Sequence, residues 1–123
     1  MSCLSVIVPL YNEAPGIVQF HERLRSVLQS LAMDSEVLYV DDGSDDATPR
    51  LLDSLCEGES DVGYLRLSRN FGKEAAMSAG LDHVRGDAVI IIDGDLQDPP
   101  ELIGEFVAQW RNGYDVVYGK RIS

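Results

Sequence analysis

The chain has 123 residues, 45% hydrophobic and 25% charged, which is typical of a soluble globular protein with one core. Its net charge of −11 disfavours nucleic-acid binding as the main role, because such a surface repels phosphate backbones. The apolar runs are far shorter than the ~20 residues of a membrane span, and the start MSCLSVIVPL is typical of a strand rather than a secretory signal.

The cysteines and histidines give little sign of a catalytic or zinc site. Cys3 and Cys56 form no CxxC pair and have no histidine at ligand spacing. We interpret them as two reduced thiols of an intracellular protein, with a disulfide as the alternative.

Strand and helix patterns alternate along the chain. Short β-branched runs predict strands at 4–10, 36–42, 62–68, 87–93 and 114–120. Apolar residues at helical spacing, together with Ala-rich and Pro-led segments, predict helices at 14–31, 47–56, 72–84 and 99–112, with Thr48 as an N-cap. This alternation predicts a three-layer α/β fold, with a mainly parallel sheet and helices on both faces.

A polar cluster follows each of the first four predicted strands. The clusters are YNE, DDGSDD, SRNFGK and DGDLQD. In parallel sheets, ligands bind beyond the carboxyl ends of the strands. The clusters therefore predict a ligand site at that edge.

The cluster IIIDGDLQDPPE (90–101) places carboxylates directly after an apolar strand. Asp93 and Asp95, separated by Gly94, would approach one Mg²⁺ or Mn²⁺, because these hard cations prefer oxygen ligands and often bridge a carboxylate to phosphates. Gln97 would add an amide oxygen. The alternative for so short a pattern is a solvated acidic turn, and Asp98 is also interpreted as the cap of the next helix.

The clusters after the first two strands offer contacts for an organic ligand. Tyr11 would pack on a base ring and Glu13 would reach a ribose hydroxyl or a cation. The alternatives are ordinary packing and a glutamate that complements a helix dipole. Asp41 or Asp42 would accept hydrogen bonds from a ligand, whereas the carboxylates at 45–46 are interpreted as solvated or capping groups.

The third cluster brings two basic residues into an acidic protein. Arg69 and Lys73 flank Gly72 at the expected start of a helix. A helix N-terminus with a lysine is a ready anion site, and the alternative is a solvent-exposed lysine. The loop is neither a Walker A motif nor a GxGxxG motif.

VIVPLYNE, VDDGS, SRNFGKEAAMSAGL and IIIDGDLQDPPE together closely resemble glycosyltransferase family 2. The likeness is strongest to its polyprenyl-phosphate branch, which includes enzymes like dolichyl-phosphate mannose synthase and bactoprenol glucosyltransferase. It extends from the first strand to VVYGKR. The resemblance implies a GT-A fold and an inverting glycosyltransferase that uses Mg²⁺ or Mn²⁺ and a nucleotide sugar, with a UDP-hexose favoured over a GDP-linked sugar.

By motif position, the resemblance implies roles for individual residues. The metal ligands would be Asp93, Asp95 and Gln97, of which the two aspartates would serve catalysis through the metal. The nucleotide would be held by Pro9, Tyr11, Glu13, Asp41 or Asp42, Lys73, Asp93 and Gly94. Asp42 is favoured for the base, and Lys73 would lie near the donor diphosphate.

The resemblance also implies that part of the enzyme lies outside this sequence. Enzymes of the family continue with an acceptor half, and several add transmembrane helices. Residues 1–123 are therefore expected to be the nucleotide-sugar-binding part of a domain truncated at its C-terminus, which binds donor but does not transfer sugar alone. The implied acceptor is a polyprenyl phosphate. The implied location is cytoplasmic, at the cytoplasmic face of the membrane for the full-length protein.

Two other classes share some of these features. A phosphate-binding regulatory module of the receiver type also has acidic strand ends, but it needs a phosphoacceptor aspartate after its third strand, where this chain has LSRN. A nucleotidyl-sugar pyrophosphorylase needs a Gly-rich basic loop after its first strand, where this chain has PLYNEAPG. Both fit less well than a glycosyltransferase.

Overall fold

The computed structural model describes residues 3–31, 33–84, 86, 88–94, 100–111 and 117–118, and within them the alternation is confirmed. The strands are β1 (Cys3–Leu10), β2 (Asp34–Asp41), β3 (Val62–Arg66), β4 (Ala88–Ile91) and β5 (Val117–Tyr118). The helices are α1 (Ile17–Ser30), α2 (Thr48–Cys56), α3 (Lys73–Leu81) and α4 (Ile103–Arg111), which follows the 3-10 turn η1 (Pro100–Leu102). The predicted boundaries differ from these by a few residues.

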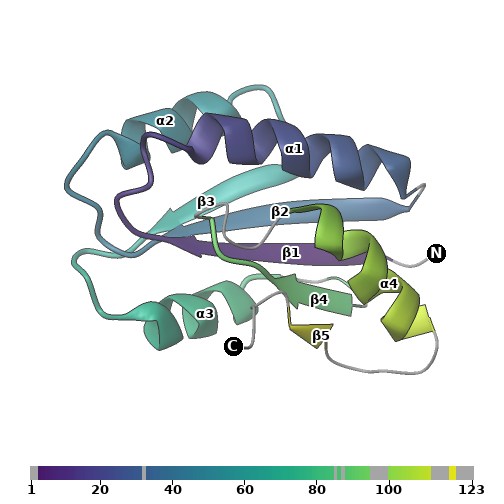
Figure 1. Ribbon diagram of the computed structural model, residues 1–123. Coiled ribbons are helices and arrows are strands. Elements are labelled where there is room, and N and C mark those ends of the chain that lie inside the picture. The colour runs from purple at the N-terminus through teal and green to yellow at the C-terminus, as the bar shows by residue number, and fades with distance from the viewer. Residues whose placement is uncertain are drawn as a thin grey trace.

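The strands form one parallel sheet in the order β3-β2-β1-β4-β5 (Figure 1). On β1, Val6 pairs with Val37 of β2 on one side and with Ile90 of β4 on the other. The strand order therefore reverses at β1, and such a switch point is where open α/β sheets bind ligands. The order also counts against a receiver module, whose sheet places strand three beside strand one.

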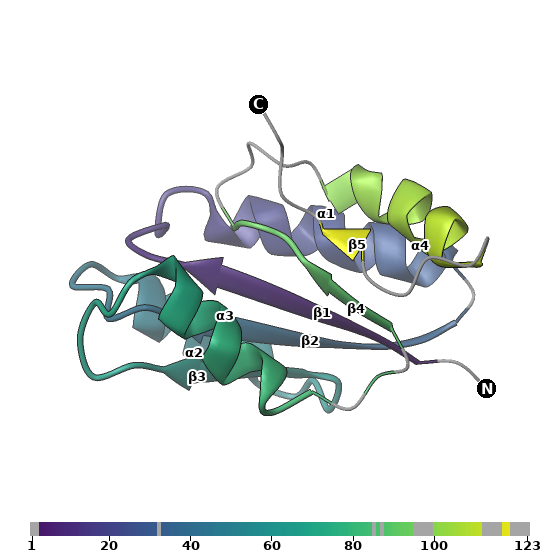
Figure 2. The ribbon, with the colours of Figure 1, turned by 90° about the horizontal axis from the view of Figure 1, so that it is seen from below.

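Helices cover both faces of the sheet, as predicted (Figures 1 and 2). The helices α1, α2 and α4 lie on one face, where Val6 and Val8 of β1 are buried with Phe20 of α1. The helix α3 lies on the other, where Ile7 is buried with Ala76. Burying each large apolar side chain contributes about 1.5–3 kcal/mol, so the alternation of β1 side chains stabilises both layers.

Small residues set how closely α3 approaches the sheet. Ala76 is fully buried, and a Cβ added at Gly80 would lie 2.6 Å from Ile7 Cγ2. A larger residue at position 80 would push the helix away from β1. This close packing fixes the first residue of α3, Lys73, above the carboxyl ends of the central strands.

One predicted cap is wrong and another lies outside the described residues. α2 begins at Thr48 itself, and the backbone N–H of Thr48 donates to Asp46 Oδ1 at 2.9 Å. The Thr48 hydroxyl instead accepts the N–H of Glu13 at 3.0 Å, because the loop after β1 packs against this helix start. Asp98 lies outside the described residues. Among the helices that the structure describes, none has the length and apolarity to cross a membrane.

Candidate functional site

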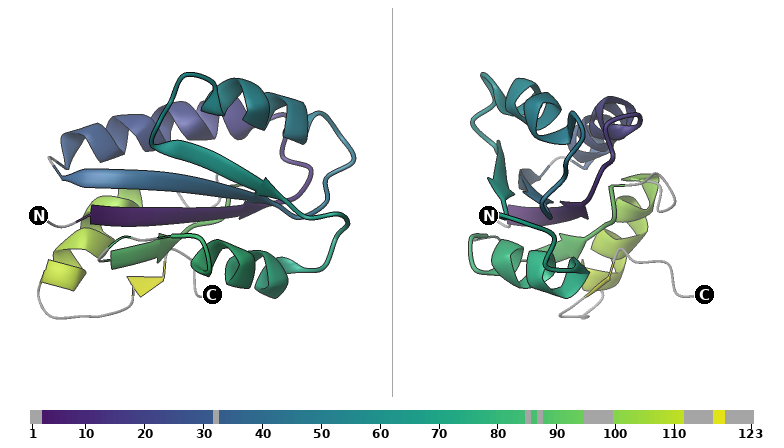
Figure 3. Two further views of the ribbon diagram at one scale, coloured as in Figure 1. Left: turned by 180° about the vertical axis from the view of Figure 1, so that it is seen from behind. Right: turned by 90° about the vertical axis from the view of Figure 1, so that its left-hand side faces the viewer.

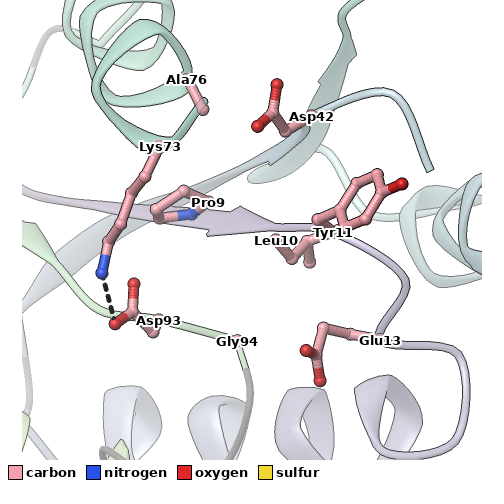
Figure 4. Close-up of a pocket in the computed structure, with 9 residues that line it drawn as sticks. All are labelled: Pro9, Leu10, Tyr11, Glu13, Asp42, Lys73, Ala76, Asp93 and Gly94. Atoms are coloured by element: carbon pink, nitrogen blue, oxygen red, sulfur yellow. Dashed lines mark hydrogen bonds and ion pairs between the residues drawn. The ribbon is translucent and has the colours of Figure 1, made fainter. Parts of the chain in front are cut away.

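The loops that follow β1, β2 and β3 gather at one end of the sheet (Figure 3). A pocket opens there, at the switch point between β1 and β4 (Figure 4). Its lining residues are Pro9, Leu10, Tyr11, Glu13, Asp42, Lys73, Ala76, Asp93 and Gly94. The cavity measures about 210 Å³. Ligand pockets usually measure ~300–1,000 Å³, so this volume accommodates only part of a nucleotide sugar.

An ion pair closes one side of the pocket. Lys73 Nζ donates to Asp93 Oδ2 at 2.6 Å, and Figure 4 shows the lysine extending from α3 to the carboxylate that follows β4. The Asp93 side chain is 21% exposed and the Lys73 side chain is 39% exposed. The predicted metal-binding and phosphate-binding residues are therefore direct neighbours.

Asp42 anchors the loop that leads into α3. Its two carboxylate oxygens accept the backbone N–H groups of Phe71 at 2.9 Å and Gly72 at 3.0 Å. Asp42 is 5% exposed but still lines the pocket. Since a carboxylate has about four lone-pair sites, two remain for a ligand.

Asp41 is built into the protein interior and does not line the pocket. It is fully buried, and its Oδ1 accepts the N–H of Ser44 at 3.1 Å and the Ser44 hydroxyl at 2.5 Å. Its Oδ2 lies 3.9 Å from Arg66 Nε and has no hydrogen-bond partner among the described residues. Of the two candidates for base recognition, only Asp42 reaches the pocket.

A set of hydrogen bonds fastens the loop after β1 to the loop after β2. The Ser44 hydroxyl accepts the N–H of Asn12 at 2.8 Å, and the Asn12 side chain accepts the N–H of Asp45 at 3.0 Å. Asp46 accepts the N–H of Ala14 at 3.3 Å. Partial desolvation raises the pKa of Asp46, but bonds from Thr48 and Ala14 outweigh it and hold that pKa below its ordinary value. The network positions the backbone between Tyr11 and Glu13.

Gly43 allows a third loop to pack against the first two. Its φ is +76°, and an added Cβ would lie 2.2 Å from the backbone carbon of Arg69. No side chain fits this contact. The close approach brings the loop before α3 within reach of Asp42.

The Asp93 carboxylate supplies the kind of oxygen ligand that a hard divalent cation prefers. The Asp93 carboxylate faces the pocket and already attracts a positive group, the ammonium of Lys73. Within the described part of the chain, no group of three or more His, Cys, Asp or Glu residues is placed to hold a metal. The other predicted ligands, Asp95 and Gln97, lie outside the described residues, so the full metal site stays a prediction.

The structure brings most of the predicted nucleotide-binding residues together. The pocket includes Pro9, Tyr11, Glu13, Asp42, Lys73, Asp93 and Gly94, and it leaves out Asp41. The sequence interpretation missed the lining residues Leu10 and Ala76, which have no polar signature. It also missed the positioning role of Ser44, although the turn VDDGS contained a signal for it.

The chain is similar to known proteins over most of its length. A family model described as "Glycosyl transferase family 2" matches residues 5–123. A protein named as an uncharacterized glycosyltransferase of Synechocystis sp. is 48% identical over 98% of this chain and 38% of its own length. The bactoprenol glucosyl transferase of Shigella phage SfV is 42% identical over 96% of this chain. The chain spans 38% of the length of each of these two curated relatives.

Solved structures also match most of this chain. The mannosyltransferase PcManGT from Pyrobaculum calidifontis, in complex with GDP-Man and Mn²⁺, matches with a TM-score of 0.70 and 28% identity, over 87% of this chain and 31% of that protein. S. aureus TarS 1-349 in complex with UDP matches with a TM-score of 0.62 and 26% identity, over 87% of this chain and 33% of that protein. The GT-A fold implied by the sequence is confirmed.

Proposed function

Because the chain belongs to glycosyl transferase family 2, we propose that it is the donor-binding part of an inverting, metal-dependent glycosyltransferase. The observation that carries this proposal is the pocket at the switch point, which joins residues from the ends of β1, β2 and β4 and from the start of α3. The pocket would hold the nucleotide of the donor, with a UDP-hexose favoured by the likeness to bactoprenol glucosyl transferases.

The charges in the pocket favour the presence of an added cation when a diphosphate binds. The described lining carries the carboxylates of Glu13, Asp42 and Asp93 against the single ammonium of Lys73. A nucleoside diphosphate brings further negative charge. A structural relative that was solved in complex with GDP-Man and Mn²⁺ supports a divalent cation here.

Asp93 would hold this cation together with Asp95 and Gln97. When bound, the cation would neutralise negative charge that develops on the departing nucleoside diphosphate. Lys73 would place a second positive charge at the phosphates, and Asp42 would accept a hydrogen bond from the base. Tyr11, which is 40% exposed, would pack on the base ring, and Glu13 would bind the ribose.

We propose a polyprenyl phosphate as the acceptor, on the likeness to bactoprenol glucosyl transferases. A lipid phosphate is already ionised at neutral pH, so it needs little help from a general base. The reaction would take place at the cytoplasmic face of a membrane. The acceptor-binding part would lie in chain beyond residues 1–123.

Calorimetric titration with UDP and GDP, with and without Mn²⁺, tests the donor site. We expect UDP to bind in a Mn²⁺-dependent way, and Asp93→Asn to weaken that binding roughly tenfold or more by removing a cation ligand. Asp34→Asn is the matched control, because Asp34 is exposed at the start of β2, at the opposite end of that strand from the pocket. If the folded chain binds neither nucleotide with Mn²⁺, the proposal is wrong.

A further inference from the structure

We propose that Lys73 competes with the divalent cation for Asp93, so that cation and nucleotide bind cooperatively. The lysine would neutralise Asp93 in the empty site and move to the diphosphate when the cation takes its place. This inference rests on the proposed function, because it assigns to that site an exchange of partners between two ligands.

The geometry of the ion pair makes the competition direct. Lys73 Nζ lies 2.6 Å from Asp93 Oδ2, which is the distance of a short charge-assisted hydrogen bond. A cation that binds the same carboxylate must displace the ammonium or share the carboxylate with it. Displacement costs the free energy of the ion pair, and sharing adds repulsion between two positive charges, so either event weakens cation binding to the nucleotide-free protein.

The start of α3 is held in place while the lysine side chain can move. Asp42 fixes the backbone N–H groups of Phe71 and Gly72, and Ala76 is fully buried one turn further on. Lys73 has a flexible four-carbon stem and is exposed to the pocket. Its ammonium can therefore leave Asp93 without any shift of the helix.

The charges that line the pocket explain why cation binding and diphosphate binding favour each other. Lys73 is the only cationic side chain among the lining residues that the structure describes. A diphosphate that enters without a cation must draw this charge away from Asp93 and leave the carboxylate uncompensated. A cation on Asp93 removes that cost, and the diphosphate in turn removes the competitor of the cation. The coupling is reciprocal, as thermodynamic linkage requires.

Mn²⁺ binding without nucleotide tests the competition, with free Mn²⁺ measured by electron paramagnetic resonance. The ion pair is partly exposed, so we expect Lys73→Met to bind Mn²⁺ only about three- to tenfold more tightly than the wild type. Arg50→Met removes the same charge from an exposed position on α2 and should change the affinity much less. Lys73→Arg keeps the charge and should stay close to the wild type.

A double-mutant cycle measures the exchange from the nucleotide side, with UDP titrated in EDTA. If Asp93 holds the lysine, Lys73→Met should weaken metal-free UDP binding several-fold more in an Asp93→Asn background than in the wild type. Equal losses in both backgrounds would show that the two residues act independently. Circular dichroism first verifies that each variant is folded.

The outcomes separate this inference from the proposed function. If the wild type binds UDP with Mn²⁺ but Lys73→Met binds Mn²⁺ no more tightly than Arg50→Met, the ion pair only ties α3 to β4 and the inference is wrong. If no variant binds Mn²⁺, the inference is also wrong. If Mn²⁺ binds but UDP and GDP do not, it is the proposed donor site that fails.

Discussion

Ser44 offers a direct test of the network that holds the pocket loops together. The substitution Ser44→Ala removes a hydroxyl that is 3% exposed, accepts the N–H of Asn12 and donates to Asp41. Asn12 is exposed, so water can replace its lost acceptor. The bond to the buried Asp41 carboxylate cannot be replaced so easily, because only the Ser44 N–H remains on that oxygen.

The expected cost follows from the charged acceptor. Losing a hydrogen bond to a buried charged group costs about 1.5–3 kcal/mol of the free energy of unfolding. Urea unfolding followed by circular dichroism measures this loss. Ser54→Ala is the matched control, because Ser54 is exposed on α2 and its substitution should change stability by less than about 0.5 kcal/mol. A loss at Ser44 no larger than the control would refute the reasoning.

Two further predictions concern the loops and the core. We expect Gly43→Ala to weaken Mn²⁺-dependent UDP binding, because the new Cβ would overlap the backbone of Arg69 and displace the loop that Asp42 holds. Calorimetry measures this affinity, and an unchanged value would contradict the prediction. Burial, followed by the nearby charge of Arg25, lowers the pKa of His21, which is hydrogen-bonded to Tyr39. The unfolded chain therefore binds a proton first as the pH falls below about 6.5, so the free energy of unfolding should decrease. Urea unfolding at about pH 7.5 and about pH 5.5 measures this decrease, which should be smaller in His21→Gln.

The sequence by itself determined the order of the elements and the position of the site along the chain. Strand and helix patterns depend on local hydrophobic spacing, which can be read without knowing what packs on what. The run before Asp93 and the cluster around Asp42 lie at strand ends for the same local reason. The family could be recognised because its motifs are short continuous segments in a fixed order.

Only the tertiary structure decided which of two neighbouring aspartates reaches the pocket and which distant residues meet there. Asp41 and Asp42 are adjacent, but consecutive residues at a strand end face opposite sides of the sheet. Asp42 faces the same side of the sheet as Val40. The helix α3 covers that side, and Asp42 lines the pocket there. The contact of Lys73 with Asp93 depends on the pairing of β1 with β4 and on how closely α3 packs. Such contacts are set by packing between segments far apart in the chain, which local patterns do not encode.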